Sequence, residues 1–132
     1  FEALSYMWGD QTIRTTITLE GSPFSISKHL RGAIQTLRHQ TRVRYLWIDA
    51  ICINQSDIQE RNEQVGLMRS IYQRAKAVLV WLDREVDSSH ASFQKLQKLS
   101  GESELSDLGD DPELWSPVYQ LFKDPYWSRV WI

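Results

Sequence analysis

Two short apolar segments on either side of a long helical pattern constrain the fold of this chain most strongly. Residues 45–48 and 77–82 are strand-sized apolar runs without a charge. Between them, residues 57–74 place Val65, Met68 and Tyr72 on one stripe, which is the spacing of an amphipathic helix. Uninterrupted apolar runs are typical of strands buried on both faces of a parallel sheet, and a helix usually connects two such strands. The segment therefore predicts a strand–helix–strand unit with both strands buried.

The N-terminal part of the chain predicts further strands. Residues 1–8 form a short strand that ends at Gly9 and Asp10, a turn signal. Residues 13–19 alternate between apolar and polar side chains, which is the pattern of a half-buried strand. The Gly-Ser-Pro sequence at residues 21–23 then predicts a break after this strand.

Ser27 is suited to cap a helix that follows this break. The inward face of that helix would carry Leu30, Ile34 and Leu37, which have i, i+4 and i+7 spacing. Strands that alternate with helices indicate an α/β fold. We therefore predict an open, largely parallel central sheet with helices on both faces and an extra N-terminal strand or hairpin.

The C-terminal part of the chain is more polar at first. Residues 83–111 lose apolar content and become acidic, so we expect a helix over residues 89–99 and then a solvated loop. Pro112 suits the first turn of another helix, which we predict over residues 112–122. The Asp-Pro pair at residues 124–125 predicts one more turn, and residues 128–132 a last strand.

The composition excludes several classes of protein. Fifteen Lys and Arg against 17 Asp and Glu give a formal net charge of −2, which provides no general attraction to nucleic acid or an anionic membrane. No apolar run approaches the roughly 18 residues that cross a bilayer. We expect a cytoplasmic protein without membrane insertion. Residues 1–132 are expected to form a single domain excised from a longer multidomain protein.

The only cysteine, Cys52, excludes an internal disulfide and fits a reducing compartment. It lies between Ile51 and Ile53, so we expect a small buried apolar side chain and not a nucleophile. No His and Cys residues have the spacing of metal ligands, and no glycine-rich phosphate loop is present. The sequence therefore predicts no metal and no resident cofactor.

Four segments that span almost the whole chain carry a resemblance to a known family. They are residues 2–10, residues 46–72, residues 75–82 and residues 127–131. In this order they resemble the heterokaryon incompatibility (HET) domain family of fungal cell-death proteins. One short motif would be weak support, but four segments in register are specific.

The resemblance implies an effector domain of fungal allorecognition, which triggers death of the mixed cell when incompatible cells fuse. Such domains are joined to sensing or oligomerising modules. Their fold resembles the flavodoxin-like TIR domain, and Ser5, Tyr6 and Asp10 are similar to the TIR opening strand. Some TIR domains hydrolyse NAD with a glutamate on a helix beside the nucleotide cleft. The chain departs from the TIR pattern at residues 13–19, which predict a strand in place of a helix.

Glu60 is the candidate catalytic residue that this resemblance implies. It falls in the first turn of the predicted long helix, just beyond the carboxyl end of a central strand, where open α/β sheets bind ligands. A carboxylate there could stabilise the cationic ribosyl group that forms as nicotinamide leaves NAD. The residues also allow a structural interpretation, because Asp57 and Glu60 have the spacing of a capping box.

Asp49, Asn54, Arg61 and Gln64 are candidates for lining the same nucleotide cleft. Asp49 ends a buried strand and could hold a ribose or pair with Arg61, or it could instead tie down the following loop. Arg61 lies on the predicted inward stripe of the helix and could contact a phosphate. Asn54 is also a natural turn former, and Gln64, one turn after Glu60, could equally be exposed.

The loop after the first strand carries the remaining candidates, Trp8, Gly9 and Asp10. TIR domains have part of their nucleotide site there. Trp8 could stack on a base or on the nicotinamide ring, and Gly9 would let the backbone approach the ligand closely. The alternative is a core tryptophan followed by a turn glycine and a capping aspartate.

Two functions remain open from the sequence. In the first, the domain is an NAD glycohydrolase, with NAD as its substrate. In the second, it is a non-catalytic module that signals through self-association or through sensor and oligomerising partners. The enzyme requires Glu60 and Asp49 to face one open pocket. The signalling module would show Glu60 folded back onto its own helix start and no cavity beside Trp8.

Overall fold

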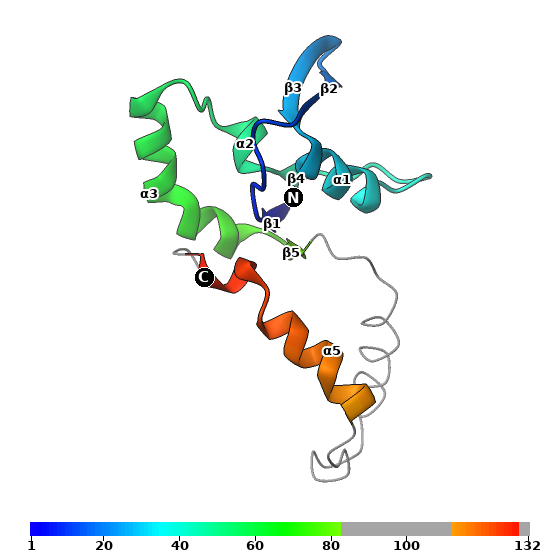
Figure 1. Cartoon of the computed structure of the whole chain (residues 1–132). Helices are drawn as coiled ribbons and strands as arrows, with labels where there is room; N and C mark the ends of the chain where they lie inside the picture. The colour runs from blue at the N-terminus through cyan, green and yellow to red at the C-terminus, as the bar shows by residue number, and fades with distance from the viewer. Residues whose placement is uncertain (83–111, 130–132) are drawn as a thin grey trace. The chain divides into compact units, whose positions relative to one another are not determined.

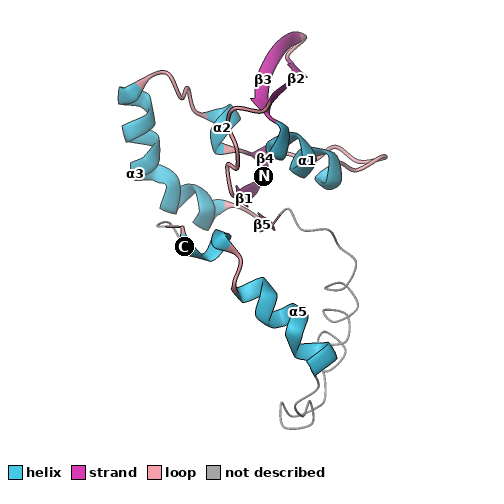
Figure 2. Ribbon diagram, in the orientation of Figure 1, coloured by secondary structure: helices cyan, strands magenta, loops and turns pink. Residues whose placement is uncertain are grey.

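The computed structural model describes residues 1–82 and 112–129 of the chain (Figure 1). The chain falls into two compact units, Phe1–Asp83 and Arg84–Ile132. The described residues of the first unit form a parallel sheet, an antiparallel hairpin and three helices (Figure 2). The predicted mixed α/β fold is confirmed.

The central sheet has the strand order β4-β1-β5, and both outer strands run parallel to β1. Its members are β1 (Glu2–Tyr6), β4 (Leu46–Trp47) and β5 (Val78–Trp81). The chain winds from β1 to one side and then crosses to the other, so the winding direction reverses at β1. Such a reversal is the switch point of a doubly wound sheet. The predicted open parallel sheet is therefore present, while the likeness to TIR domains stays a prediction.

One face of this sheet packs against helix α1 (Lys28–Leu37). Leu4 and Tyr6 of β1 are 0% and 2% exposed and cluster with Leu30 of the helix. The Oγ of Ser27 accepts a hydrogen bond from the Leu30 N–H at 3.1 Å, so the helix is capped at the predicted residue. Full burial of a leucine side chain stabilises the folded state by about 1.5–3 kcal/mol. The cluster of buried side chains on this face is the main core of the first unit.

A hairpin is inserted between β1 and α1. It consists of β2 (Arg14–Leu19) and β3 (Ser22–Ser27), paired antiparallel. The strand ends at Leu19 and turns at Gly21, so the predicted break is present, but it is shorter than expected because β3 begins at Ser22. Glu20 and Gly21, with φ values of 50° and 80°, make the whole turn, and two left-handed residues are what a tight hairpin requires.

The opposite face of the sheet is contacted by helix α3 (Ile58–Arg74), which begins and ends close to the predicted residues. The Tyr72 hydroxyl donates a hydrogen bond to the Leu4 carbonyl at 3.2 Å. Its ring meets Trp47 edge-on, with the ring centroids 5.7 Å apart. Figure 1 draws α1 and α3 on opposite sides of β1, as the reversal of winding requires.

Strand β5 is less buried than predicted. Val78 pairs with Ala3 in the register and, with Val80, points to the face that α3 contacts. Both valines remain largely accessible, at 45% and 46% exposed. The prediction that residues 77–82 are buried on both faces is therefore wrong. The side chains of the other face of β5, Leu79 and Trp81, pack against the core.

A short helix, α2 (Asp49–Cys52), follows β4 directly. It was not predicted, and it shortens the expected strand over residues 45–48 to Leu46–Trp47. Cys52 is exposed, so the expectation of a buried thiol is also wrong. Successive residues of a helix point about 100° apart, and the neighbouring isoleucines therefore need not enclose it.

The described residues of the second unit form helix α5 (Pro112–Phe122) and the 3₁₀ helix η2 (Pro125–Ser128). Helix α5 confirms the prediction for residues 112–122. Asp124 caps η2 by accepting a hydrogen bond from the Tyr126 N–H at 2.9 Å, which confirms the predicted turn. The Trp127 indole donates to the Leu121 carbonyl at 2.7 Å and ties η2 back to the end of α5.

Three predictions fall wholly or partly outside the described residues. They are the helix over residues 89–99, the acidic loop after it, and the last strand over residues 128–132, whose first residue belongs to η2. Within the described part of the chain, no helix has the length and apolar character of a membrane span.

Candidate functional site

The carboxyl ends of β1 and β4 bring together two candidate residues that are far apart in the sequence. The Trp8 indole N–H donates a hydrogen bond to Oδ2 of Asp49 at 2.9 Å. Asp49 is 7% exposed, whereas Trp8 is 38% exposed. Parallel strands end at the same edge of a sheet, and this edge is where open α/β folds bind ligands.

The other polar atoms of Asp49 organise the loop that follows. Its Oδ1 accepts a hydrogen bond from the Ala50 N–H at 2.7 Å, and its carbonyl accepts one from the Gln55 side-chain amide at 3.0 Å. These contacts correspond to the predicted alternative in which Asp49 ties down the loop. Arg61 is exposed, and among the described residues no ion pair joins it to Asp49. The predicted pairing of the two is therefore wrong.

Glu60 is turned toward the loop before its own helix. Its Oε1 accepts a hydrogen bond from the Asn54 N–H at 3.0 Å. Asp57 is the residue that caps α3, because its Oδ1 accepts from the N–H groups of Gln59 and Glu60 at 2.9 Å and 3.1 Å. The two carboxylates together satisfy backbone donors on both sides of the helix start, as in a capping box.

Asn54 and Gln64 flank Glu60 in the sequence. The Asn54 Oδ1 accepts a hydrogen bond from the Ser56 N–H at 3.1 Å, which is the contact of an Asx turn. Gln64 is half-buried on α3. Asn54 therefore stabilises the loop, and the role of Gln64 in a cleft stays a prediction.

Gly9 has a left-handed backbone that a side chain would disturb. Its φ is +63°, a region that favours glycine. A Cβ built at this position would lie 3.1 Å from Cγ of the His29 ring, which is tighter than an ordinary contact. The backbone of the loop after β1 is thus pressed against α1, so the close approach that the glycine permits is to the protein's own histidine.

Asp10 is exposed and closes a local turn. Its Oδ1 accepts hydrogen bonds from the hydroxyl and the N–H of Thr12, at 2.6 Å and 2.8 Å. These two hydrogen bonds favour the charged form and lower the pKa of Asp10 below its ordinary value of 3.8. The carboxylate is therefore ionised at neutral pH and available on one side to solvent.

A hollow of about 350 Å³ lies beside this loop. It is lined by Asp10, Ile13, Lys28, His29 and Gly32. Lys28 and His29 were not singled out from the sequence, although a signal was available. A helix N-terminus favours acidic residues over basic ones. The first turn of α1 carries Lys28 and His29 and no acidic residue, which runs against this preference.

Metal binding has no support in the described residues. No group of three His, Cys, Asp or Glu side chains among them could hold a metal ion. The exposed Cys52 is the only sulfur nucleophile of the chain, and its Sγ accepts a long hydrogen bond of 3.5 Å from the Ile48 N–H.

Comparison with known proteins decides the family. The model of the family described as heterokaryon incompatibility protein (HET) matches residues 1–132. The chain belongs to this family. One curated relative, heterokaryon incompatibility protein 6 (OR allele) of Neurospora crassa, is 39% identical over 92% of the chain. The chain spans 20% of the length of that relative. No solved structure matches the chain significantly.

In this heterokaryon incompatibility domain, two of the three carboxylates singled out from the sequence serve the fold, and the third, Asp10, lines the hollow beside the loop after β1. Asp49 holds Trp8 and the start of α2, and Glu60 holds the backbone of Asn54. Neither of them lines the hollow beside Gly9. The geometry therefore shows one feature expected of a signalling module, a folded-back Glu60, together with a hollow that Asp10 lines and that Trp8 does not.

Proposed function

We propose that this chain is the effector domain of a heterokaryon incompatibility protein, which acts in fungal allorecognition and triggers death of cells formed by incompatible fusion. The match of the family model along residues 1–132 supports this proposal. The 39% identical relative, itself named as a heterokaryon incompatibility protein, also supports it. The expected partners are sensor and oligomerising domains of the same or other proteins in the cytoplasm.

We further propose that the domain acts through protein contacts and not by consuming a nucleotide. The hydrogen bond of 3.0 Å from the Asn54 N–H to Glu60 carries this proposal. A carboxylate that stabilises a ribosyl cation must face the reacting bond, and a carboxylate that serves as a backbone acceptor at a helix start would first have to leave that position. Glu60 would then be part of the scaffold that presents a signalling surface.

NAD hydrolysis is the second candidate function, and one observation favours it. The winding of the sheet reverses at β1, and nucleotides bind at the carboxyl edge of such sheets. In this alternative, NAD is the substrate and its nicotinamide–ribose bond is cleaved beside Glu60. The cleft would be shaped by Trp8, Gly9, Asp10, Asp49, Asn54, Arg61 and Gln64.

The substitution Glu60→Gln separates the two candidates. A glutamine keeps an oxygen that can accept the Asn54 N–H but removes the charge that a ribosyl cation needs. We would express the complete parent protein in fungal cells and measure both killing and NAD content. We would also assay the purified domain on a multivalent scaffold for release of nicotinamide.

We expect the Glu60→Gln protein to kill as well as the parent, with no nicotinamide released by either. If nicotinamide is released by the parent domain and Glu60→Gln abolishes both release and killing at an unchanged Tm, the second candidate is correct. If the Glu60→Gln domain still releases nicotinamide, the domain is an enzyme but Glu60 is not its catalytic residue.

A further inference from the structure

The amino-terminal edge of the sheet carries a second hollow, on the side opposite to Trp8 and Asp49. Here the chain enters all three parallel strands. The Lys76 N–H donates to the Phe1 carbonyl, and the Glu2 N–H donates to the Tyr45 carbonyl, both at 2.9 Å. The hollow has a volume of about 270 Å³, and four of its lining residues are basic: His39, Arg42, Arg44 and Lys76.

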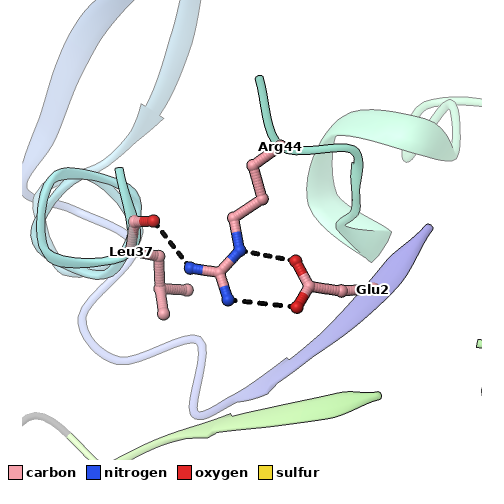
Figure 3. A network of polar contacts seen from close by, with 3 residues as sticks. All are labelled: Glu2, Leu37 and Arg44. Carbon is pink, nitrogen blue, oxygen red and sulfur yellow. Dashed lines mark hydrogen bonds and ion pairs between the residues drawn. The ribbon is translucent and has the colours of Figure 1, made fainter. Parts of the chain in front are cut away.

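Arg44 is fully engaged in the fold (Figure 3). Its Nε and Nη2 bind the two carboxylate oxygens of Glu2 at 2.5 Å and 3.1 Å, and its Nη1 donates to the Leu37 carbonyl at 2.7 Å. The guanidinium lowers the pKa of Glu2 and the carboxylate raises that of Arg44, so both are charged and compensate one another. Glu2, the one acidic residue that lines the hollow, therefore leaves no uncompensated negative charge there.

The other basic residues of the hollow form no such bidentate pair, although the charge of Lys76 also acts on Glu2 through space. His39, Arg42 and Lys76 are exposed, and within the described part of the chain none of their side chains forms a hydrogen bond or a close ion pair. Residues 1–82 carry ten Lys and Arg against seven Asp and Glu, so the surrounding unit is itself positive although the whole chain has a net charge of −2. An anion in the hollow would meet two permanent cations without displacing an internal carboxylate.

Helix ends do not account for these cations. The C-termini of α1 and α3 lie at the same end of the sheet, and helix C-termini favour nearby basic residues. The α1 terminus already has Arg44 on the Leu37 carbonyl, and α3 carries Arg74 in its last turn. Arg42 and Lys76 lie outside both helices, and within the described residues neither side chain bonds a helix carbonyl.

We propose that this hollow binds the phosphate group of a small organic phosphate, with Arg42 and Lys76 as its charged contacts. A guanidinium and an ammonium together match the charge and the acceptor oxygens of phosphate. Tyr45 lines the same hollow, is 74% exposed, and offers a ring to the organic part of the ligand. The volume is at the lower limit of ligand sites, which favours a phosphate with one sugar or ring over a dinucleotide. This inference does not depend on the proposed function.

Calorimetric titration of the 132-residue chain tests the proposal. The chain would be N-acetylated, so that the amino group of Phe1 adds no charge. The probes are inorganic phosphate, adenosine monophosphate, and phosphatidylcholine vesicles with and without phosphatidic acid. The variants are Arg42→Gln, Lys76→Gln and, as a matched control, Arg69→Gln, which removes the same charge from an exposed position on α3.

We expect Arg42→Gln and Lys76→Gln each to weaken binding of the phosphate probes about tenfold, and Arg69→Gln to change it less than twofold. Binding of adenosine monophosphate tighter than that of inorganic phosphate, with the difference lost in Tyr45→Ala, supports a free organic phosphate as the ligand. Binding confined to phosphatidic acid vesicles identifies a lipid headgroup as the source of the same phosphate chemistry. Absence of binding to all probes, or an equal loss in Arg69→Gln, overturns the proposal.

Discussion

The two edges of the parallel sheet use their charged residues in opposite ways. At the carboxyl edge, Asp49 and Glu60 are both consumed as acceptors for indole or backbone N–H groups. At the amino edge, Glu2 and Arg44 bind one another, whereas the other basic residues that line the hollow remain exposed. Location at the ligand-binding edge of a fold is therefore a weak guide to function until the hydrogen bonds of each carboxylate are counted.

The largest expected effect is the loss of the buried acceptor at the carboxyl edge. Asp49→Ala leaves the Trp8 indole without its acceptor and frees the start of α2, and we expect it to reduce the free energy of unfolding by about 2–3 kcal/mol. Asp49→Asn keeps an oxygen for the indole, so it should lose about half as much or less. Urea unfolding of both variants measures the difference. Equal losses would mean that the charge of Asp49, and not its hydrogen bond to Trp8, is what the fold needs.

Substitution of Gly9 should have the next largest effect on stability, and Gly66→Ala is a control with the opposite expected sign. Gly9→Ala forces a side chain into a left-handed residue against His29 and should destabilise the protein by about 1–2 kcal/mol. Gly66→Ala, in the middle of α3 with open space around it, should stabilise the protein by about 0.5–1 kcal/mol. Thermal unfolding of the two variants tests this pair. If Gly9→Ala is neutral, the loop after β1 is looser than its contact with His29 implies.

Two carboxylates at the start of α3, Asp57 and Glu60, are expected to contribute differently to the free energy of unfolding. Asp57→Ala removes the acceptor for two N–H groups and should cost about 1 kcal/mol. Glu60→Gln keeps the acceptor for the Asn54 N–H and should change stability by less than about 0.5 kcal/mol. Denaturant midpoints at neutral pH provide the measurement. A large loss in Glu60→Gln would show that its charge interacts with the helix start more strongly than a hydrogen bond alone.

The smallest expected effect is a difference in acid sensitivity at the amino edge. Arg44 holds the pKa of Glu2 below its ordinary value of 4.5, so the folded protein binds this proton more weakly than the unfolded chain. The stability that this pair contributes is complete above pH 4.5 and is lost as the pH falls through the lowered pKa of the folded state. Glu2→Gln should therefore lose less stability on acidification than the parent. Asp10→Asn, measured in parallel, reports the corresponding contribution at the carboxyl edge, where Thr12 lowers the pKa.

Helices α1 and α3 could be predicted from the sequence because each has a cap signal and a periodic apolar face, and α5 because Pro112 suits a first helical turn. Strand β3 was missed because Pro23 and the small residues around it resemble a loop, and only the two left-handed residues before it reveal the hairpin. Helix α2 was missed because its four residues are too few to show a period.

The candidate site was predictable as a set of residues but not as a set of contacts. Trp8 and Asp49 meet across 41 positions, and only the strand order brings them together. Arg61 was placed on the inward face by helical spacing alone. The 17 residues of α3 extend about 25 Å, whereas the five residues of β1 extend about 17 Å, so part of the helix runs beyond the sheet. A residue in the part of the helix beyond the sheet has no strand of the described sheet to pack against, even if it lies on the apolar stripe.

The brevity of β4 has a consequence for motion within the fold. With two residues, it is joined to β1 over two register positions, whereas β5 is joined to β1 over four. Local opening requires less free energy where fewer ladder bonds must break, so amide hydrogen exchange should release β4 before β5. Because only Ile48 separates Asp49 from β4, each opening also strains the hydrogen bond from the Trp8 indole to Asp49. The hydrogen bond between the Trp8 indole and Asp49 is therefore expected to restrain opening at this side of the sheet.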